Sequence, residues 1–225
     1  MNRLFNVMLI MLAVIGMTLG VRSGMAADPA KLQDVNAILD RVEARYMAAG
    51  FSARFSQIST IKAMEITDTA SGKLFVKRPG KMRWEYETPE PQIIVTDSRM
   101  LWVYRPQDHQ VMIGDAPVFF GDGRGAGFLA DMNQIREGFE IIHLTDAAAR
   151  DYILRLIPKK PIAEVADILL AVDRDTFELK QIITTNAYGD ETRIELNDLD
   201  LNRTPDDSLF TFEVPEGAEV LQLDQ

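Results

Sequence analysis

The sequence predicts an α+β domain in which one large antiparallel sheet is accompanied by a few helices. Runs of strand length with period-two alternation recur about every 8–12 residues, which is typical of an antiparallel meander. Turn-forming pairs such as Ser71-Gly72, Pro79-Gly80 and Asp97-Ser98 separate these runs. One helical pattern precedes the first strand, and a shorter one lies in the middle of the chain.

The first 26 residues are predicted to be a signal peptide that is absent from the mature protein. Arg3 precedes an apolar run from Leu4 to Gly20, and the small residues around Gly24-Met25-Ala26 place the expected cut before Ala27. The alternative is a membrane anchor, but the run is shorter than the ~20 apolar residues that a transmembrane helix needs. Cleavage leaves residues 27–225, which we interpret as one domain.

A helix is expected directly after the signal peptide. Asp28 is a suitable N-cap residue, and Pro29 suits the first helical position. Gly50 is expected to end the segment. The apolar residues between them follow helical spacing: Leu32, Val35, Ile38, Leu39, Val42 and Tyr46. Such a helix can cover one face of a sheet with its apolar side.

The predicted strands fall into two groups. The first group comprises Phe51–Ser56, Ile58–Ile66, Leu74–Arg78, Met82–Tyr86, Ile93–Thr96, Leu101–Tyr104 and Gln110–Ile113. The second comprises Phe139–Leu144, Tyr152–Ile157, Ile168–Val172, Leu179–Thr185 and Thr192–Asn197, and alternation returns at Phe210, Phe212 and Val214. The faces differ most in Lys81–Glu87, where Met82, Trp84 and Tyr86 share one side and charged residues the other. This pattern predicts a half-buried antiparallel strand.

The segment between the two groups is rich in proline and glycine. It covers Asp115–Gly127 and leads into apolar residues at helical spacing, namely Phe128, Leu129, Met132 and Ile135. Its alternating glycines do not have the spacing of a phosphate-binding loop, and no βαβ unit surrounds them. We therefore interpret the segment as a hinge that precedes a short helix.

Charge and composition argue against several functions. Removal of Arg3 and Arg22 with the signal peptide takes the net charge from −10 to −12, which disfavours binding to nucleic acid or anionic lipid. The chain has no cysteine, so we expect neither disulfides nor a lipid anchor. With only His109 and His143 and no Gly-x-Ser-x-Gly motif, we expect no enzyme activity, metal site or cofactor.

Large apolar side chains recur with period two, so each pair can line one face of the sheet. The pairs are Phe51 and Phe55, Trp84 and Tyr86, and Trp102 and Tyr104. Two interpretations stay open. The pattern alone favours an ordinary hydrophobic core, whereas an apolar cavity would use flexible methionines such as Met82 to adapt to variable acyl chains.

Arg78 also allows two interpretations. It has the same parity as Leu74 and Val76, so its side chain can point to the apolar face, where carbonyls at a helix end would be suitable partners. Alternatively, it ends the strand before Pro79 and turns into solvent.

These motifs, taken together, resemble the periplasmic outer-membrane lipoprotein carrier proteins, the LolA family. The matching segments occur in a consistent order over most of the mature chain: Phe51–Gln57, Gly72–Gly80, Met82–Tyr86, Pro91–Asp97, Leu101–Tyr104 and Phe210–Gly217. The resemblance implies an incomplete, strongly curved antiparallel β-barrel, a half-barrel, covered by a helical lid. That lid would consist of Gly125–Arg136 and the Asp28–Ala49 helix.

The resemblance also implies a function without bond chemistry. Such a carrier accepts lipoproteins from an inner-membrane ABC transporter, shields their acyl chains in the periplasm, and delivers them to an outer-membrane acceptor lipoprotein. Arg78 would be the latch between sheet and lid, and Met82 stands where the family often has an aromatic residue or leucine. We expect a soluble, periplasmic monomer. The expected cavity lining is Phe51, Phe55, Leu74, Val76, Met82, Trp84, Tyr86, Trp102, Tyr104, Phe128, Leu129 and Met132.

Three other functions remain to be separated from this one. The acceptor lipoprotein has the same fold but carries a lipidated cysteine, which is absent here. A half-barrel sensor domain would bind lipidated or misfolded envelope proteins. A periplasmic lipid hydrolase would need a nucleophile and a base, and its turnover would be abolished by one serine or histidine mutation.

Overall fold

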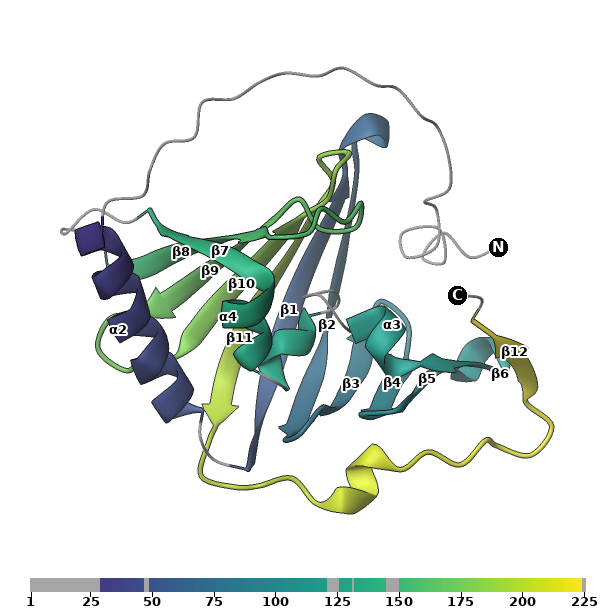
Figure 1. Cartoon of the computed structure of the whole chain (residues 1–225). Coiled ribbons are helices and arrows are strands. Elements are labelled where there is room, and N and C mark those ends of the chain that lie inside the picture. The colour runs from purple at the N-terminus through teal and green to yellow at the C-terminus, as the bar shows by residue number, and fades with distance from the viewer. Residues whose placement is uncertain (1–28, 47–48, 121–125, 131, 145–149, 224–225) are drawn as a thin grey trace.

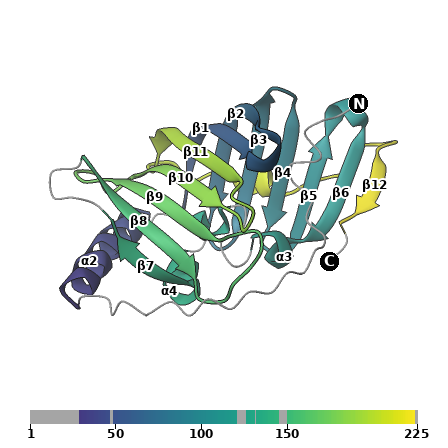
Figure 2. The ribbon, with the colours of Figure 1, turned by 90° about the horizontal axis from the view of Figure 1, so that it is seen from above.

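A single curved sheet dominates the computed structural model, which describes residues 29–46, 49–120, 126–130, 132–144 and 150–223. For residues 29–34 it describes the backbone alone. The 12 strands lie in the order β12-β6-β5-β4-β3-β2-β1-β11-β10-β9-β8-β7, so the sheet is open at β12 and at β7. Viewed from above, it forms an arc (Figure 2). The expected half-barrel with a helical cover is thereby confirmed.

The strands form two antiparallel meanders. The first consists of β1 (Gly50–Ile61), β2 (Ile66–Lys77), β3 (Lys81–Thr88), β4 (Gln92–Asp97), β5 (Met100–Arg105) and β6 (Gln110–Asp115). The second consists of β7 (Phe139–His143), β8 (Asp151–Pro158), β9 (Asp167–Asp173), β10 (Leu179–Thr185) and β11 (Glu191–Asp200). Pairing of β1 with β11 joins the two meanders, for example at Phe55 and Leu196.

The helices lie on the inner side of the arc (Figure 1). They are α2 (Pro29–Arg45), α3 (Ala116–Phe120) and α4 (Asn133–Gly138), and residues 126–129 form a further helical turn. Helix α2 starts at the predicted proline. The predicted short helix is divided, since Phe128 and Leu129 lie in the turn, Ile135 lies in α4, and Met132 lies just before α4. The signal peptide, its cleavage site and Asp28 lie outside the described residues. No helix in the described ranges is both long and apolar enough to cross a membrane.

The C-terminal segment from residue 201 to residue 223, here called the C-terminal arm, passes along the outer side of β3, β4 and β5 and then reaches the edge of β6. Arg83 donates a hydrogen bond to the Leu209 carbonyl, 3.2 Å away. Asp207 lies 2.8 Å from the ammonium groups of both Lys77 and Lys81. The arm ends in β12 (Glu219–Gln222), which pairs in parallel with β6. This parallel strand was not predicted.

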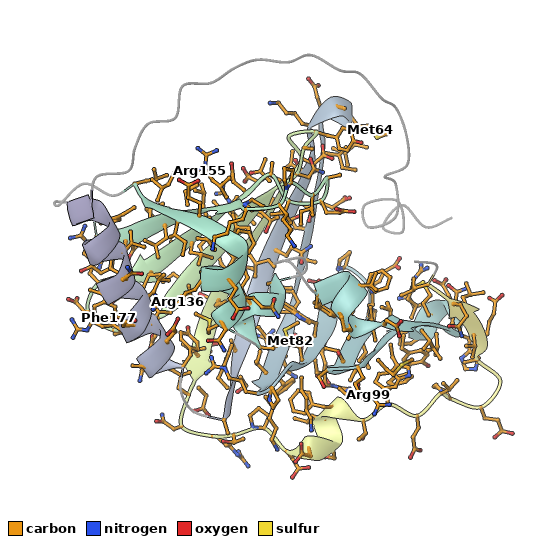
Figure 3. The ribbon with its side chains drawn as sticks, viewed as in Figure 1. Met64, Met82, Arg99, Arg136, Arg155 and Phe177 are labelled. Atoms are coloured by element: carbon orange, nitrogen blue, oxygen red, sulfur yellow. The ribbon has the colours of Figure 1, made fainter. Side chains whose placement is uncertain are left out.

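The predicted strands differ from the structure most clearly in two places. The expected strand Ile58–Ile66 is instead a hairpin, since β1 ends at Ile61 and a short helical turn (Lys62–Met64) leads into β2. Glu65 permits this reversal with a left-handed backbone, at φ 53°. Met64 lies at the tip of the hairpin (Figure 3). Phe210 lies in a helical turn (Asp207–Phe210) rather than in a strand.

Candidate functional site

The inner face of the first meander is an apolar floor. The cross-strand partners Ala53, Leu74, Trp84, Ile94 and Val103 run across five neighbouring strands and share this face. All five are buried. Lys81, Arg83, Glu85 and Glu87 lie on the other side of β3, so the predicted alternation of this strand is confirmed.

Phe55 is the centre of an aromatic cluster on this floor. Its ring centroid is 4.9 Å from that of Trp84 and 5.0 Å from that of Tyr86, and both pairs are edge-to-face. Gly72 makes this packing possible, because a Cβ there would lie 3.0 Å from the Phe55 ring and 1.9 Å from the Glu85 carbonyl oxygen. Edge-to-face pairs add about 0.5–1.5 kcal/mol to the free energy gained by burial.

The helices cover this floor with their own apolar side chains. Helix α2 contributes Val35, Ile38, Leu39 and Val42, and the described residues of the segment 126–138 contribute Phe128, Leu129, Met132 and Ile135. These residues form one buried cluster with the floor, and Phe128 and Leu129 are almost completely inaccessible to solvent. The described structure is therefore a closed state, in which side chains of the cover occupy the inner face.

Arg78 joins the end of β2 to the end of α2. Its Nη1 donates a hydrogen bond to the carbonyl oxygen of Tyr46, the residue that follows α2. Its backbone N–H donates to the Ala49 carbonyl at 2.8 Å. Of the two interpretations of Arg78, the structure therefore shows the one in which its guanidinium binds a carbonyl at a helix end.

The C-terminal end of α2 is attached to the turn between β9 and β10. The Arg41 guanidinium lies 4.2 Å from the centroid of the Phe177 ring, and Arg45 forms an ion pair with Glu178. The Tyr46 hydroxyl accepts a hydrogen bond from the backbone N–H of Leu179 at 3.0 Å. Burial raises the pKa of Tyr46 to about 12. These contacts hold α2 to the second meander.

Arg136 of α4 binds polar side chains of α2 and lies between the two helices (Figure 3). Its Nε is 2.7 Å from Glu43, its Nη2 is 2.5 Å from Asp40, and its Nη1 is 3.1 Å from Asn36. The three acceptors follow one stripe of α2 at helical spacing. The Glu43 hydrogen bond, with the nearby Asp40, raises the pKa of Arg136 above its usual value, so the guanidinium stays charged. Arg136 and its three partners on α2 are called the clamp below.

A polar chain borders the aromatic cluster on the inner face. The Tyr86 hydroxyl donates to Gln57 Oε1 at 3.0 Å, and Gln57 Nε2 donates to Ser59 Oγ at 3.0 Å. Burial raises the pKa of the Tyr86 hydroxyl to about 12, so it is a neutral donor at physiological pH. Neither Gln57 nor Ser59 was predicted as a site residue, although both continue the inward parity of Phe51 and Phe55 along β1.

The structure brings the predicted cavity residues together in one cluster, except for Trp102 and Tyr104. These two lie on the outer face of β5, opposite the buried Leu101 and Val103. Their ring centroids lie 6.4 Å and 5.7 Å from that of Phe212 in the C-terminal arm. Their assignment to the cavity is thus wrong, because both faces of β5 are apolar and the arm covers the outer one.

The second meander supplies a part of the floor that the prediction missed. Its inward residues include Leu154 and Leu156 on β8, and Ile168, Leu170 and Val172 on β9. The period-two pattern of β9 was visible in the sequence, but the prediction considered mainly aromatic residues. Within the described ranges, histidine and carboxylate side chains do not gather in groups of three that could bind a metal ion.

Comparisons with known proteins agree with this architecture. The family described as "Outer membrane lipoprotein carrier protein LolA" matches residues 47–213. An outer-membrane lipoprotein carrier protein of Azotobacter vinelandii is 29% identical over 220 residues, covering 98% of this chain and 99% of the relative. That of Nitrosomonas europaea is 30% identical over 175 residues, covering 78% and 84%. The crystal structure of an uncharacterized conserved protein from Thermus thermophilus is similar in fold, with a TM-score of 0.54 at 13% identity over 85% of this chain and 100% of that chain.

Proposed function

Because the chain belongs to the outer-membrane lipoprotein carrier protein family, we propose that it binds the acyl chains of lipoproteins in the periplasm and carries them to the outer membrane. Its relatives are named for this role. The observation that carries the proposal is the apolar floor of a curved sheet, closed by helices that contribute apolar side chains of their own. The proposed function includes no chemical step.

The energetics of acyl chains explain why such a carrier needs a covered floor. Each methylene group exposed to water costs about 0.8 kcal/mol, so a bare acyl chain in the periplasm would aggregate or return to a membrane. In the closed state, Phe128, Leu129 and Met132 occupy the floor in place of a ligand. Cargo would replace these contacts with its own, which keeps the free-energy difference between the empty and loaded states small.

The contacts of the cover indicate which part moves. Helix α2 is held to the β9–β10 turn by Arg41, Arg45 and Tyr46. The segment 126–138 is held to α2 by Arg136, and to the β2–β3 turn by the hydrogen bond from Gly80 N–H to the Ala130 carbonyl, at 3.3 Å. We infer that this segment leaves the floor first, and that full opening also requires the end of α2 to separate from the end of β2.

We also propose that Arg78 is the latch that sets the balance between closed and open states. Its hydrogen bond to the Tyr46 carbonyl connects the floor to the end of α2. A carrier must release its cargo, so the free-energy difference between the closed and open states has to be moderate. The Arg78→Leu variant is expected to load lipoprotein normally but to deliver it poorly. Normal delivery by this variant would contradict the latch.

The proposed route runs from an inner-membrane ABC transporter to an outer-membrane acceptor lipoprotein. The test is a release assay, in which spheroplasts that contain newly made lipoproteins are incubated with the purified mature chain. Lipoprotein in the soluble fraction as a one-to-one complex would support the carrier function. If an established carrier releases lipoprotein in parallel and this protein does not, the proposal fails, and binding of misfolded envelope proteins by a sensor domain becomes the function to test.

A further inference from the structure

The polar chain of Tyr86, Gln57 and Ser59 lies where the apolar floor ends. Phe51, Ala53 and Phe55 of β1 are buried on the inner face, and Gln57 and Ser59 continue the same parity. Tyr86 reaches the same place from β3, where it is paired across Gly72 of β2. Its ring packs against Phe55, so the aromatic cluster and the polar chain are in direct contact.

The hydrogen bonds of this polar chain run in one direction, from Tyr86 to Ser59, and the polar chain ends in groups that can still donate. The Tyr86 hydroxyl donates to the Gln57 carbonyl, and the Gln57 amide donates to the Ser59 hydroxyl oxygen. Within the described residues, the Ser59 hydroxyl hydrogen and the second Gln57 amide hydrogen have no acceptor. Ser59 is only 7% exposed. A buried donor without an acceptor is costly, and hydrogen bonds arranged in series polarise the terminal donor further.

An ester carbonyl has the complementary chemistry. It accepts hydrogen bonds and donates none, so it complements the polar chain of Tyr86, Gln57 and Ser59, which ends in donors. It also stands at the junction between an acyl tail and a polar headgroup, as Gln57 and Ser59 stand between an apolar floor and the more polar end of β1. Successive inward residues of a strand are about 6.5 Å apart, a few bonds along an extended acyl chain.

We propose that Tyr86, Gln57 and Ser59 form a subsite for the ester carbonyl at the head of an acyl chain whose tail lies along Phe55 and Trp84. This inference rests on the proposed function and adds a specificity to it. The carrier recognises the linkage of the acyl chain as well as its apolar tail. It therefore distinguishes a fatty ester from an alkyl chain of the same length.

The test compares two synthetic lipopeptides that differ only in this linkage. One carries two palmitoyl esters on a thioether-linked glycerol, and the other carries the corresponding hexadecyl ethers. Binding to the mature chain is followed through Trp84 fluorescence, in a Trp102→Phe background that silences the outer-face tryptophan. We expect the ester to bind about three- to tenfold more tightly, the range of one net hydrogen bond.

Variants separate recognition from structural support. Ser59→Ala is expected to reduce the affinity for the ester to that for the ether, while leaving the ether unchanged. Tyr86→Phe keeps the ring packing and is expected to reduce the same preference. Ser56→Ala, a neighbouring change on the outer face of β1, is the matched control and should alter neither affinity.

The possible failures are distinguishable. If the wild type binds ester and ether equally, the subsite is refuted and the carrier function stands. If Ser59→Ala weakens both ligands equally, the polar chain supports the sheet rather than the ligand, and the subsite is again refuted. If neither lipopeptide binds, both the carrier function and the subsite are overturned.

Discussion

Removal of the Arg136 guanidinium is predicted to open the cover while the sheet stays folded. Arg136 is the side chain that clamps α4 to α2, through Asn36, Asp40 and Glu43. The guanidinium is about one-third exposed and Asp40 is mostly exposed, so solvent screening reduces each contribution. We assign about 1–2 kcal/mol to the clamp as a whole. Since 1.4 kcal/mol corresponds to a factor of ten, Arg136→Met should raise the open fraction about 5- to 30-fold.

Amide hydrogen exchange measures this change directly. The backbone N–H of Ile135 bonds to the Met132 carbonyl and that of Ala130 to the Gly127 carbonyl, so both amides report on the cover. Their exchange should accelerate by the same factor of about 5 to 30 in Arg136→Met. Exchange in the paired centre of β1 and β2 should not change, because those hydrogen bonds do not involve the cover.

The matched control is Arg155→Met. Arg155 lies on the outer face of β8 and forms an ion pair with Asp167 at 2.6 Å, so its replacement removes a similar partly exposed charge without touching the cover. Figure 3 shows both arginines. Unchanged exchange at Ile135 in Arg136→Met would refute the reasoning. Equal acceleration in the sheet would refute it as well, because the clamp would then stabilise the whole fold.

Three further predictions concern the arm and the floor. Hydrogen bonds from Lys77 and Lys81 lower the pKa of Asp207 to about 2. The stabilisation that this shift gives should be present above about pH 4 and be lost as the pH falls toward about 2. The acid-unfolding curve of Asp207→Asn should therefore lack the loss of stability that the wild type shows in that window. Because Met82 is only 1% exposed, Met82→Ala should lower the free energy of unfolding by about 2–4 kcal/mol in urea titrations. A decrease below about 1 kcal/mol would show that the floor collapses around the cavity left by the side chain. Phe212→Ala should shift Trp102 emission to the red, whereas an unchanged spectrum would mean that the arm covers this face without Phe212.

The sequence predicted the faces of β3 well and those of β5 poorly, for a physical reason. In β3, apolar residues alternate with charged ones, so only one face can be buried. In β5, Leu101 and Val103 alternate with Trp102 and Tyr104, and both faces are apolar. The alternation then fixes which residues share a face, but not which face is inside. That choice depends on the C-terminal arm, which folds back from about 100 residues further along the chain.

The sequence also gave unequal information about the two arginines that hold the cover. For Arg78, the sequence left two interpretations open, and the one that the structure shows follows from the parity of its own strand, which points it to the apolar face. Arg136 could not be predicted, since its acceptors lie 93 or more residues away on α2 and read as an ordinary solvated helix face. Strand β12 was missed because four exposed residues in parallel pairing leave no period-two signal.

The junction between β1 and β11 has a consequence for the order of folding. Within each meander, strands pair with their neighbours in the chain, and such local contacts form quickly. The junction pairs Thr60 with Glu191, so it requires nearly the whole domain to have been synthesised and brought together. Until then, each half exposes its share of the apolar floor. The rate at which the halves meet therefore sets how long the nascent chain is vulnerable to aggregation.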